Sequence, residues 1–255
     1  MEISKKRIIF IDLDGTLIDT VSGKTFPEGV WDMKLKMEVF EQLKKLHPQA
    51  VLIASNQGGI ELGYVHPAMF QPKFIYVIAS LQSFIGINTF VAGQYCASND
   101  PSCPDRKPCP GMLEKMYQEF CSQNGFTITK EECLMIGDSY TTSEGRFIDN
   151  DSKVAEAFGC DYLDVKDFIA LELPEPLYKV FDMKTGTIPL DGNENPLTGL
   201  KEEEAIGYVT SLSSKNPNRY TWVPMLWEPP VPKQATQKKQ AKMTISKGGK
   251  ENGCN

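Results

Sequence analysis

The chain has 255 residues, 41% of them hydrophobic, a net charge of −6 and seven cysteines, an ordinary composition for a globular protein. The charge is uneven, because residues 231–255 carry six lysines and one glutamate (+5) and the rest of the chain therefore carries −11; an acidic body argues against a protein that coats nucleic acid. No stretch approaches the roughly 20 apolar residues of a membrane span, and no signal-peptide pattern is present. Scattered cysteines in odd number argue against a disulfide scaffold. We therefore expect a cytoplasmic protein, or a nuclear one in a eukaryotic cell, with no membrane partner.

The first predicted element is a buried strand at residues 8–11, and two aspartates follow it. A short β-branched apolar run of this kind is typical of a strand that is covered on both faces of a parallel sheet. Asp12 and Asp14 are separated by one residue, so strand alternation would place them on one side, and Gly15 then lets the chain turn. Open α/β sheets bind their ligands at the carboxyl ends of strands. This pair of carboxylates is therefore a candidate active site.

The rest of the first 173 residues alternates between apolar strands and amphipathic helices. Periodicity and turn residues predict a loop or flap at 18–29, a helix at 33–46, a strand at 50–55, a helix at 67–86, a strand at 88–92, a helix at 112–120, a strand at 132–138 and a helix at 154–158. This pattern predicts a Rossmann-like, doubly wound α/β domain at 1–173. Short apolar pieces between turns predict a small β-rich appendage at 174–230, and the lysine-rich residues 231–255 predict a disordered tail.

Ser22-Gly-Lys-Thr25 resembles the end of an ATP-binding P-loop. The glycine that the motif needs five residues before Gly23 is absent, because Ile18 stands there. We therefore expect no ATP site.

Polar residues also follow the other predicted strands. Ser55 ends the second strand, where a hydroxyl beside exposed amides can hold phosphate, although an ordinary turn would have the same composition. Arg106 and Lys107 lie in a proline-rich loop after the third strand, either as solvated charges or as phosphate ligands. Asp138 ends the fourth predicted strand, directly after its apolar residues. Four polar strand ends in order are more specific than any one of them.

Three cysteines in the proline-rich loop, Cys96, Cys103 and Cys109, raise the possibility of a zinc site. A structural zinc site needs four ligands, usually in close pairs. The loop has no Cys-x-x-Cys pair and no nearby histidine. This spacing does not favour a zinc site, and the zinc hypothesis stays open.

Together the strand ends indicate phosphate chemistry. Asp12 is the candidate nucleophile toward phosphorus, and Asp14 is the candidate acid and base for the leaving oxygen and the attacking water. Ser55 and Lys107 are candidates for binding phosphate oxygens. Asp138 would complete a Mg²⁺ site with Asp12 and the Asp14 carbonyl, since oxygen ligands suit this hard ion.

The ordered motifs Asp12-Leu-Asp-Gly-Thr-Leu, Ser55-Asn56, Lys107 and Gly137-Asp138 resemble those of the haloacid dehalogenase (HAD) superfamily of phosphohydrolases. The resemblance covers about residues 7–168. It implies a HAD fold, Mg²⁺ dependence and an aspartyl-phosphate intermediate on Asp12, with Ser55 and Asn56 at the phosphate.

Within that superfamily the chain resembles the 3′-phosphatase domain of polynucleotide kinase/phosphatase, a DNA-repair activity that processes nucleic-acid ends. The segments that carry this resemblance are Ser22-Gly-Lys-Thr-Phe-Pro27, Ser55-Asn-Gln-Gly-Gly-Ile60, Arg106-Lys-Pro and Asp151-Ser. The resemblance implies that residues 22–27 form a flap beside the nucleophile, that Arg106 contacts the substrate and that Asp151 supports the metal site. The family more often has threonine at the Ser55 position.

Two alternatives remain. Histidinol-phosphate and heptose-bisphosphate phosphatases share the Arg-Lys-Pro piece, but their zinc loop has a histidine and a cysteine where Ser98 and Asp105 stand here. The other alternative is a non-catalytic binding module on the same fold, which would use the lysine tail as its contact surface.

The spacing of the motifs bears on the size of the substrate. About 40 residues separate Asp14 from Ser55 and about 50 separate Ser55 from Lys107. These intervals leave room only for a minimal cap, and thus for an open site that can admit a polymer end. The oligomeric state is left open.

Overall fold

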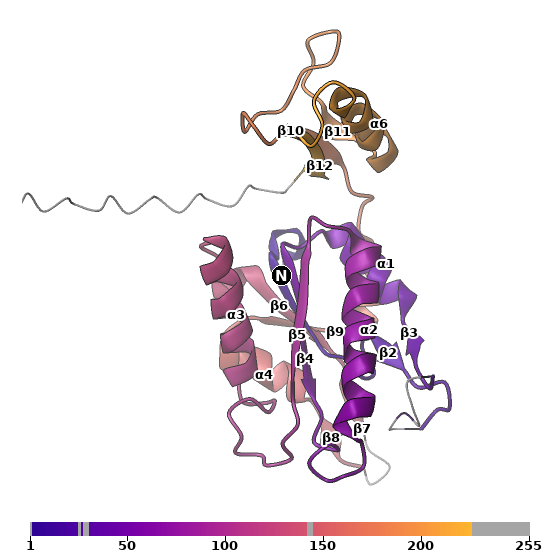
Figure 1. Ribbon diagram of the computed structural model, residues 1–255. Coiled ribbons are helices and arrows are strands. Elements are labelled where there is room, and N and C mark those ends of the chain that lie inside the picture. Colours follow the sequence, from indigo (N-terminus) through magenta and orange to yellow (C-terminus); the bar gives the residue numbers. More distant parts are fainter. Residues whose placement is uncertain (1, 25–26, 28–30, 142–144, 226–255) are drawn as a thin grey trace, which may run out of the picture.

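The apolar strands of the sequence form one parallel sheet. The computed structural model describes residues 2–24, 27, 31–141 and 145–225. Five strands lie side by side in the order β5 (Phe90–Cys96), β4 (Ala50–Asn56), β1 (Ile8–Ile11), β6 (Cys133–Gly137) and β9 (Asp161–Asp164), and every neighbouring pair is parallel (Figure 1). The predicted α/β doubly wound sheet is confirmed.

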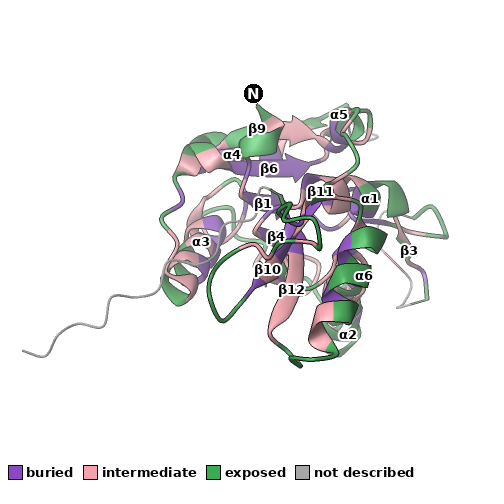
Figure 2. Cartoon of the chain, turned by 90° about the horizontal axis from the view of Figure 1, so that it is seen from above, coloured by how far each residue is buried: buried purple, intermediate pink, exposed green. Residues whose placement is uncertain are grey.

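Helices cover both faces of this sheet. One face packs against α1 (Met37–Leu46), α2 (Pro67–Ile85) and α5 (Val165–Ile169), and the other packs against α3 (Gly111–Asn124) and α4 (Asn150–Phe158). Ile9 and Ile11 point to the first face, whereas Ile8 and Phe10 point to the second. Since side chains alternate along a strand, a central strand between two helix layers must be apolar at every position. Figure 2 shows β1, β4 and β6 with buried residues in this central layer.

Two short hairpins lie beside the carboxyl end of the sheet, one formed by β2 (Ile18–Asp19) with β3 (Lys34–Leu35) and one by β7 (Tyr140–Thr141) with β8 (Phe147–Ile148). The predicted start of the first helix was wrong. The helix begins at Met37, not at residue 33, because residues 34–35 pair with residues 18–19. The rest of the predicted flap falls partly on residues 25–26 and 28–30, which lie outside the described residues. Within the described residues, the strands of these two pairs are only two residues long, which agrees with the minimal cap that the spacing predicted.

The sequence analysis did not predict the edge strand β9 or the short helix α5 that follows it. Residues 161–164 read Asp-Tyr-Leu-Asp and contain no apolar run. An edge strand is covered less fully than a central one, so β9 is half-buried or exposed along its length and tolerates these acids. The third predicted strand is also displaced, running from Phe90 to Cys96 and not from residue 88 to 92.

Residues 174–225 form a separate antiparallel sheet with strand order β11 (Thr198–Leu200), β10 (Tyr178–Asp182) and β12 (Tyr220–Pro224), and α6 (Glu202–Ser213) packs on it. The sequence analysis expected strands here and missed this helix. Figure 1 shows the unit at the end of the main sheet that is opposite β7 and β8. The predicted disordered tail at 231–255 lies outside the described residues. No helix within the described ranges is both long and apolar enough to cross a membrane.

His47, at the end of α1, joins the main sheet's helices to this second unit. Its Nε2 atom lies 2.9 Å from the hydroxyl oxygen of Tyr178, and Lys44 forms an ion pair of 3.1 Å with Glu202 beside it. Burial lowers the pKa of His47 to about 4, an effect that Glu202 partly opposes and Lys44 reinforces. His47 is therefore neutral in the folded protein at neutral pH.

We predict that the contribution of His47 to the free energy of unfolding falls as the pH drops from 6.5 toward 4. The unfolded chain takes up a proton on His47 near pH 6.5, whereas the folded chain resists it until about pH 4, so protons favour the unfolded state in this window. Between pH 7 and pH 5, protonation of His47 in the unfolded chain should lower the free energy of unfolding by about 1–2 kcal/mol. Urea titrations at both pH values measure it.

The matched variants are His47→Asn and His66→Asn. His47 has a left-handed backbone conformation (φ 49), which asparagine tolerates, and His66 caps α2 by accepting from the Ala68 amide, a role that asparagine also fills. Between pH 7 and pH 5 the free energy of unfolding of His47→Asn should rise by about 1–2 kcal/mol relative to that of the wild-type protein, and that of His66→Asn should follow the wild-type protein. An equal change in all three proteins would contradict the assignment to His47.

Candidate active site

All eight side chains that the sequence singled out line one pocket at the carboxyl end of the main sheet. The pocket has a volume of about 330 Å³, and these residues are Asp12, Asp14, Ser55, Asn56, Arg106, Lys107, Asp138 and Asp151. The strand order places the pocket there. The chain runs from β1 to β4 and β5 in one direction and to β6 and β9 in the other, and ligands bind where an open sheet reverses its order in this way. Asp12 follows β1, and Asp138 follows the neighbouring β6.

Lys107 is buried at the base of the pocket between two carboxylates. Its Nζ atom lies 2.5 Å from Asp12 Oδ1 and 2.6 Å from Asp151 Oδ1, and its side chain is 3% exposed. Burial alone would lower the pKa of Lys107, but the two carboxylates raise it above its usual range. Burial raises the pKa of Asp12, Lys107 opposes this rise, and the nearby Asp151 carboxylate adds to it. One lysine thus only partly compensates the two buried acids.

Asp12, Asp138 and Asp151 form a carboxylate cluster. Among the residues that the structure describes, this is the one group of three acidic, histidine or cysteine ligands whose donor atoms all lie within 4.8 Å of one another. Burial, and secondarily the Asp151 carboxylate, raises the pKa of Asp138 to about 6. Repulsion among close carboxylates is relieved by a cation, and an all-oxygen donor set suits Mg²⁺. The cluster fits the ion that the motifs imply.

Two glycines let these carboxylates approach the backbone. A Cβ atom on Gly15, which has a φ of +85, would lie 2.6 Å from Asp138 Oδ2, and one on Gly137 would lie 2.1 Å from Asp151 Oδ2. A side chain at either position would displace a carboxylate of the cluster. The glycine of Asp-x-Asp-Gly and the glycine before Asp138 are therefore required by the site's geometry and not by a turn alone.

The side chain of Asp14 points away from the cluster toward α2. Its Oδ1 accepts from Lys73 Nζ at 3.0 Å, and its Oδ2 accepts from Gln57 Nε2 at 2.6 Å. The same Gln57 amide donates to Ser55 Oγ at 2.8 Å. Asp14 is therefore held separately from Asp12, as two different roles require, and its predicted metal contact through the carbonyl stays a prediction.

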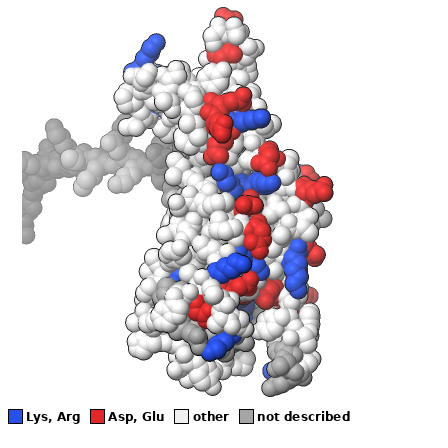
Figure 3. Space-filling view, turned by 90° about the vertical axis from the view of Figure 1, so that its right-hand side faces the viewer, with Lys and Arg blue, Asp and Glu red and all other residues white. Residues whose placement is uncertain are grey.

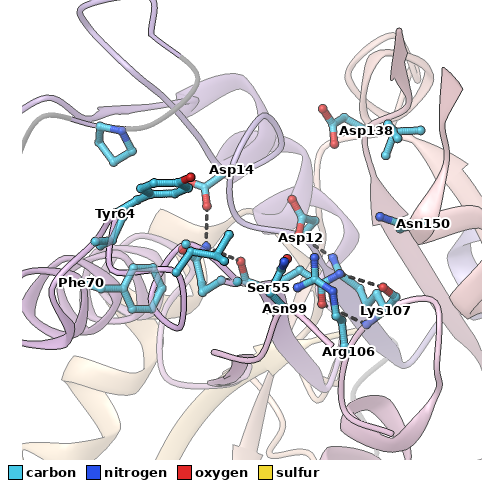
Figure 4. A pocket seen from close by; sticks show the side chains of 18 of the residues that line it. Asp12, Asp14, Ser55, Tyr64, Phe70, Asn99, Arg106, Lys107, Asp138 and Asn150 are labelled. Atoms are coloured by element: carbon cyan, nitrogen blue, oxygen red, sulfur yellow. Dashed lines mark hydrogen bonds and ion pairs between the residues drawn. The ribbon is translucent and has the colours of Figure 1, made fainter. Parts of the chain in front are cut away.

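Asn56 and Arg106 shape the loop that carries Lys107. Asn56 Oδ1 accepts from the Lys107 amide at 2.9 Å, and Asn56 Nδ2 donates to the Lys107 carbonyl at 2.8 Å. Arg106 Nη1 donates to the Ser98 carbonyl at 2.8 Å. Figure 4 shows Arg106, Asn99 and Lys107 on one side of Asp12. The predicted phosphate contacts of Asn56 and Arg106 remain predictions, while their contacts to the loop are direct.

The three loop cysteines do not form a metal site in the structure. Cys96 and Cys103 lie with their sulfur atoms 3.6 Å apart, but the sulfur of Cys109 faces the Pro101 carbonyl at 4.0 Å. Neither Asp105 nor any cysteine belongs to the carboxylate cluster described above. The geometry over the described loop gives the zinc hypothesis no third ligand.

The sequence analysis missed Lys73 and Gln57. Lys73 is a lysine on the buried face of α2, in helical spacing with Phe70 and Val77, and its side chain is only 4% exposed. A lysine at a core position of an amphipathic helix is costly unless it is paired, and this was the available signal. The partner, 59 residues away in the sequence, could not be identified from that spacing.

We predict that Lys73→Met lowers kcat by about 10- to 100-fold with little change in KM, because Asp14, the predicted general acid and base, loses the cation that fixes its carboxylate. Steady-state kinetics on a phosphate monoester measures the effect. Lys45→Met is the control, since Lys45 forms an ion pair with Glu175 at 2.8 Å away from the pocket. An unchanged kcat in Lys73→Met would show that Asp14 needs no such partner.

Several known proteins are similar to this chain. A family model described as polynucleotide kinase 3 phosphatase matches residues 7–168. An uncharacterized 20.8 kDa protein in the FGF-VUBI intergenic region of Autographa californica nuclear polyhedrosis virus is 25% identical over 176 residues, which are 66% of this chain and 88% of the viral protein. The D-glycero-beta-D-manno-heptose-1,7-bisphosphate 7-phosphatase of Helicobacter pylori strain J99 is 29% identical over 140 residues, 52% of this chain and 78% of that enzyme. A solved structure of D,D-heptose 1,7-bisphosphate phosphatase from B. bronchiseptica, complexed with magnesium and phosphate, aligns with a TM-score of 0.46 and 19% identity over 82% of this chain and 99% of that one.

Proposed function

Because the chain belongs to the polynucleotide kinase 3 phosphatase family, whose model covers residues 7–168, we propose that it is a Mg²⁺-dependent phosphomonoesterase that removes the 3′-phosphate from a nucleic-acid end. The observation that carries this proposal is the base of the pocket, where the carboxylate of Asp12 meets Lys107 and two further carboxylates. A nucleophile, a fixed cation and a set of oxygen ligands converge there, as transfer of a phosphoryl group requires.

The residues divide the reaction between them. A carboxylate oxygen of Asp12 forms a bond to phosphorus while the bond from phosphorus to the ester oxygen breaks, and Asp14 gives a proton to that leaving oxygen. Asp14 then takes a proton from the water that hydrolyses the aspartyl phosphate, which restores Asp12. Lys107 stabilises the charge on the phosphoryl oxygens, and Ser55, which lines the same pocket, supplies a further hydrogen bond. When bound to Asp12, Asp138 and Asp151, Mg²⁺ would supply positive charge that keeps Asp12 ionised.

The surroundings of the pocket favour a polymer end that is held locally. In the described part of the chain, the strands of the neighbouring pairs β2–β3 and β7–β8 are only two residues long, which supports an open site and not a capped one. On the face shown in Figure 3, acidic and basic side chains are interspersed along the molecule, which does not suit a long electrostatic contact with a phosphate backbone. Arg106 and Lys107 in the pocket instead provide cations for the terminal phosphate and its neighbour.

A second candidate is a small-molecule phosphatase, which the 29% identity to a heptose-bisphosphate phosphatase favours. The test compares a 3′-phosphorylated oligodeoxynucleotide, the corresponding oligoribonucleotide, histidinol phosphate, a heptose bisphosphate and a generic aryl phosphate, each with Mg²⁺ and with a chelator. We expect phosphate release from an oligonucleotide and from the aryl ester, with Mg²⁺ only. Turnover of the small metabolites alone would reject the nucleic-acid assignment. No turnover of any ester would indicate a non-catalytic module.

A further inference from the structure

Two cysteine thiols are in contact at the start of the loop that carries Arg106 and Lys107. Cys96 is the last residue of β5, Cys103 lies in the segment between β5 and α3, and their sulfur atoms are 3.6 Å apart. In Figure 1 this loop lies at the same end of the main sheet as β7 and β8, which is the end that holds the pocket. The phosphate chemistry described above uses neither thiol.

The two thiols have different surroundings. Cys96 is 5% exposed, whereas Cys103 is half-buried and can be reached from solvent. Burial raises the pKa of the Cys96 thiol above its usual range, and the nearby Arg106 guanidinium opposes part of this rise. The ammonium group of Lys115 interacts electrostatically with both sulfurs. Reactive cysteines are accessible and lie near cations, so Cys103 is the thiol that a reagent from solvent meets first.

The pair has no third ligand that would make it a metal site. Structural zinc takes four ligands, and no further acidic, histidine or cysteine donor of the described residues lies within 4.8 Å of both sulfurs. Disulfides of cytosolic proteins are mostly transient and redox-sensing, and exposed ones belong to the easily reduced class. Two adjoining thiols of this kind therefore suit reversible oxidation better than metal binding.

A disulfide between these cysteines needs little movement. The bond is about 2.05 Å long, so sulfur atoms that are 3.6 Å apart must approach by about 1.5 Å. Cys96 is fixed, because it pairs with Asn56 in the sheet and its carbonyl accepts from the Gln57 amide at 2.7 Å. The movement therefore falls on Cys103 and its loop.

Movement of Cys103 reaches Arg106 before it reaches Lys107. The Arg106 amide donates to the Cys103 carbonyl at 3.0 Å, so these two residues belong to one turn. Lys107 is held separately, because the side chain of Asn56 bonds to both its amide and its carbonyl. A shift of Cys103 should therefore displace Arg106, the predicted substrate contact, and leave Lys107 beside Asp12.

We propose that Cys96 and Cys103 are a redox-active dithiol that a small-molecule disulfide, such as oxidised glutathione, converts to an intramolecular disulfide, and that this bond weakens the contact of Arg106 with the substrate. The formation of the disulfide is independent of the proposed function. Only its effect on KM rests on that function, and it adds regulation to the same site.

The exchange balances without a metal or a further oxidant. The Cys103 sulfur, after losing its proton, attacks one sulfur of the reagent, which leaves a mixed disulfide on Cys103 and releases one molecule of reduced thiol. The Cys96 sulfur, after losing its proton, then attacks the Cys103 sulfur and expels the second reduced thiol. Two protein thiols are oxidised, one reagent disulfide is reduced, and the two protons end on the released thiols.

Peptide mass spectrometry tests the bond. Trypsin cleaves after Lys73 and Arg106, so both thiols fall in one peptide, residues 74–106. After the reduced full-length protein is incubated with oxidised glutathione, this peptide should be lighter by two hydrogen atoms and resist alkylation, and dithiothreitol should restore both thiols. Cys96→Ala should instead retain glutathione on Cys103. Cys103→Ser should give neither product, since Cys96 is buried.

Steady-state kinetics tests the effect on Arg106. With a 3′-phosphorylated oligonucleotide, oxidation of the wild-type protein should raise KM about 10-fold, the value of one hydrogen bond to a charged group, and change kcat by less than about 2-fold, because Lys107 keeps its place. Cys103→Ser should keep the KM of the reduced protein in oxidised glutathione. Cys109→Ser is the matched control, since the Cys109 sulfur faces the Pro101 carbonyl in the same loop, and it should respond like the wild-type protein.

The outcomes separate the disulfide from the function of the site. Both thiols still open to alkylation after excess oxidised glutathione, or a zinc ion that copurifies and protects them, would overturn the dithiol. Disulfide formation with an unchanged KM would overturn its link to Arg106. Hydrolysis of an aryl phosphate without hydrolysis of the oligonucleotide would reject the 3′-phosphatase proposal and the KM effect with it, while the mass of the peptide would still decide the disulfide.

Discussion

Replacement Asp12→Asn is expected to lower kcat by at least about 10⁴-fold, because the amide cannot form the acyl-phosphate bond to phosphorus. Asn has nearly the same shape as Asp, and Lys107 keeps its second partner, Asp151, at 2.6 Å. The fold should therefore persist. The measurements are phosphate release under saturating substrate and, after acid quenching, the labelled phosphate that stays on the protein. Wild-type protein should carry label during turnover, and the variant should carry none.

Asp191→Asn is the matched control for that variant. Asp191 is an aspartate of the second unit that accepts from the Asn193 and Asn195 amides and does not line the pocket. Its kcat should equal that of the wild-type protein. Full activity of Asp12→Asn, with wild-type circular dichroism, would refute the assignment of Asp12 as the nucleophile and require a mechanism in which water attacks the ester directly.

Lys107→Met is expected to reduce both activity and stability. The variant loses the positive charge that faces the phosphoryl group, which should lower kcat by about 10²- to 10³-fold. It also leaves Asp12 and Asp151 buried without their shared cation, since their side chains are only 10% and 5% exposed. Removing one partner of a buried ion pair costs about 3 kcal/mol. Urea unfolding in the presence of a chelator measures this loss.

Addition of Mg²⁺ should return part of that stability to Lys107→Met, because a cation among Asp12, Asp138 and Asp151 replaces the missing charge. The control is Lys115→Met, in which an exposed ion pair with Asp105 at 2.5 Å is lost; such pairs contribute at most about 1 kcal/mol. If Lys107→Met unfolds at the wild-type urea concentration in chelator, Lys107 does not stabilise the carboxylate pair. If Mg²⁺ stabilises the wild-type protein and leaves the variant unchanged, Lys107 is needed for the ion site itself.

The sheet and the position of the pocket were predictable from the sequence because each depends on local patterns. A run such as residues 8–11 can only be covered on both sides by helices, and polar residues at the ends of parallel strands must meet at one edge of the sheet. For this reason Asp12, Ser55 and Asp138 could be placed together before any distance was known. The edge strand at 161–164 and the helix at 202–213 lacked this kind of pattern and were missed.

The pairings inside the pocket depended on the tertiary structure. Lys107 lies 95 residues from Asp12 and 44 from Asp151, and Lys73 lies 59 residues from Asp14. Which lysine meets which carboxylate follows from the register of β1 against β4 and β6 and from the packing of α2, and no periodicity in the chain encodes it. The sequence by itself therefore determined the set of groups that can act on a phosphate ester. The fold alone decided that Lys107 lies between two acids and that Lys73 holds Asp14, because these contacts join segments that only packing brings within a few ångströms.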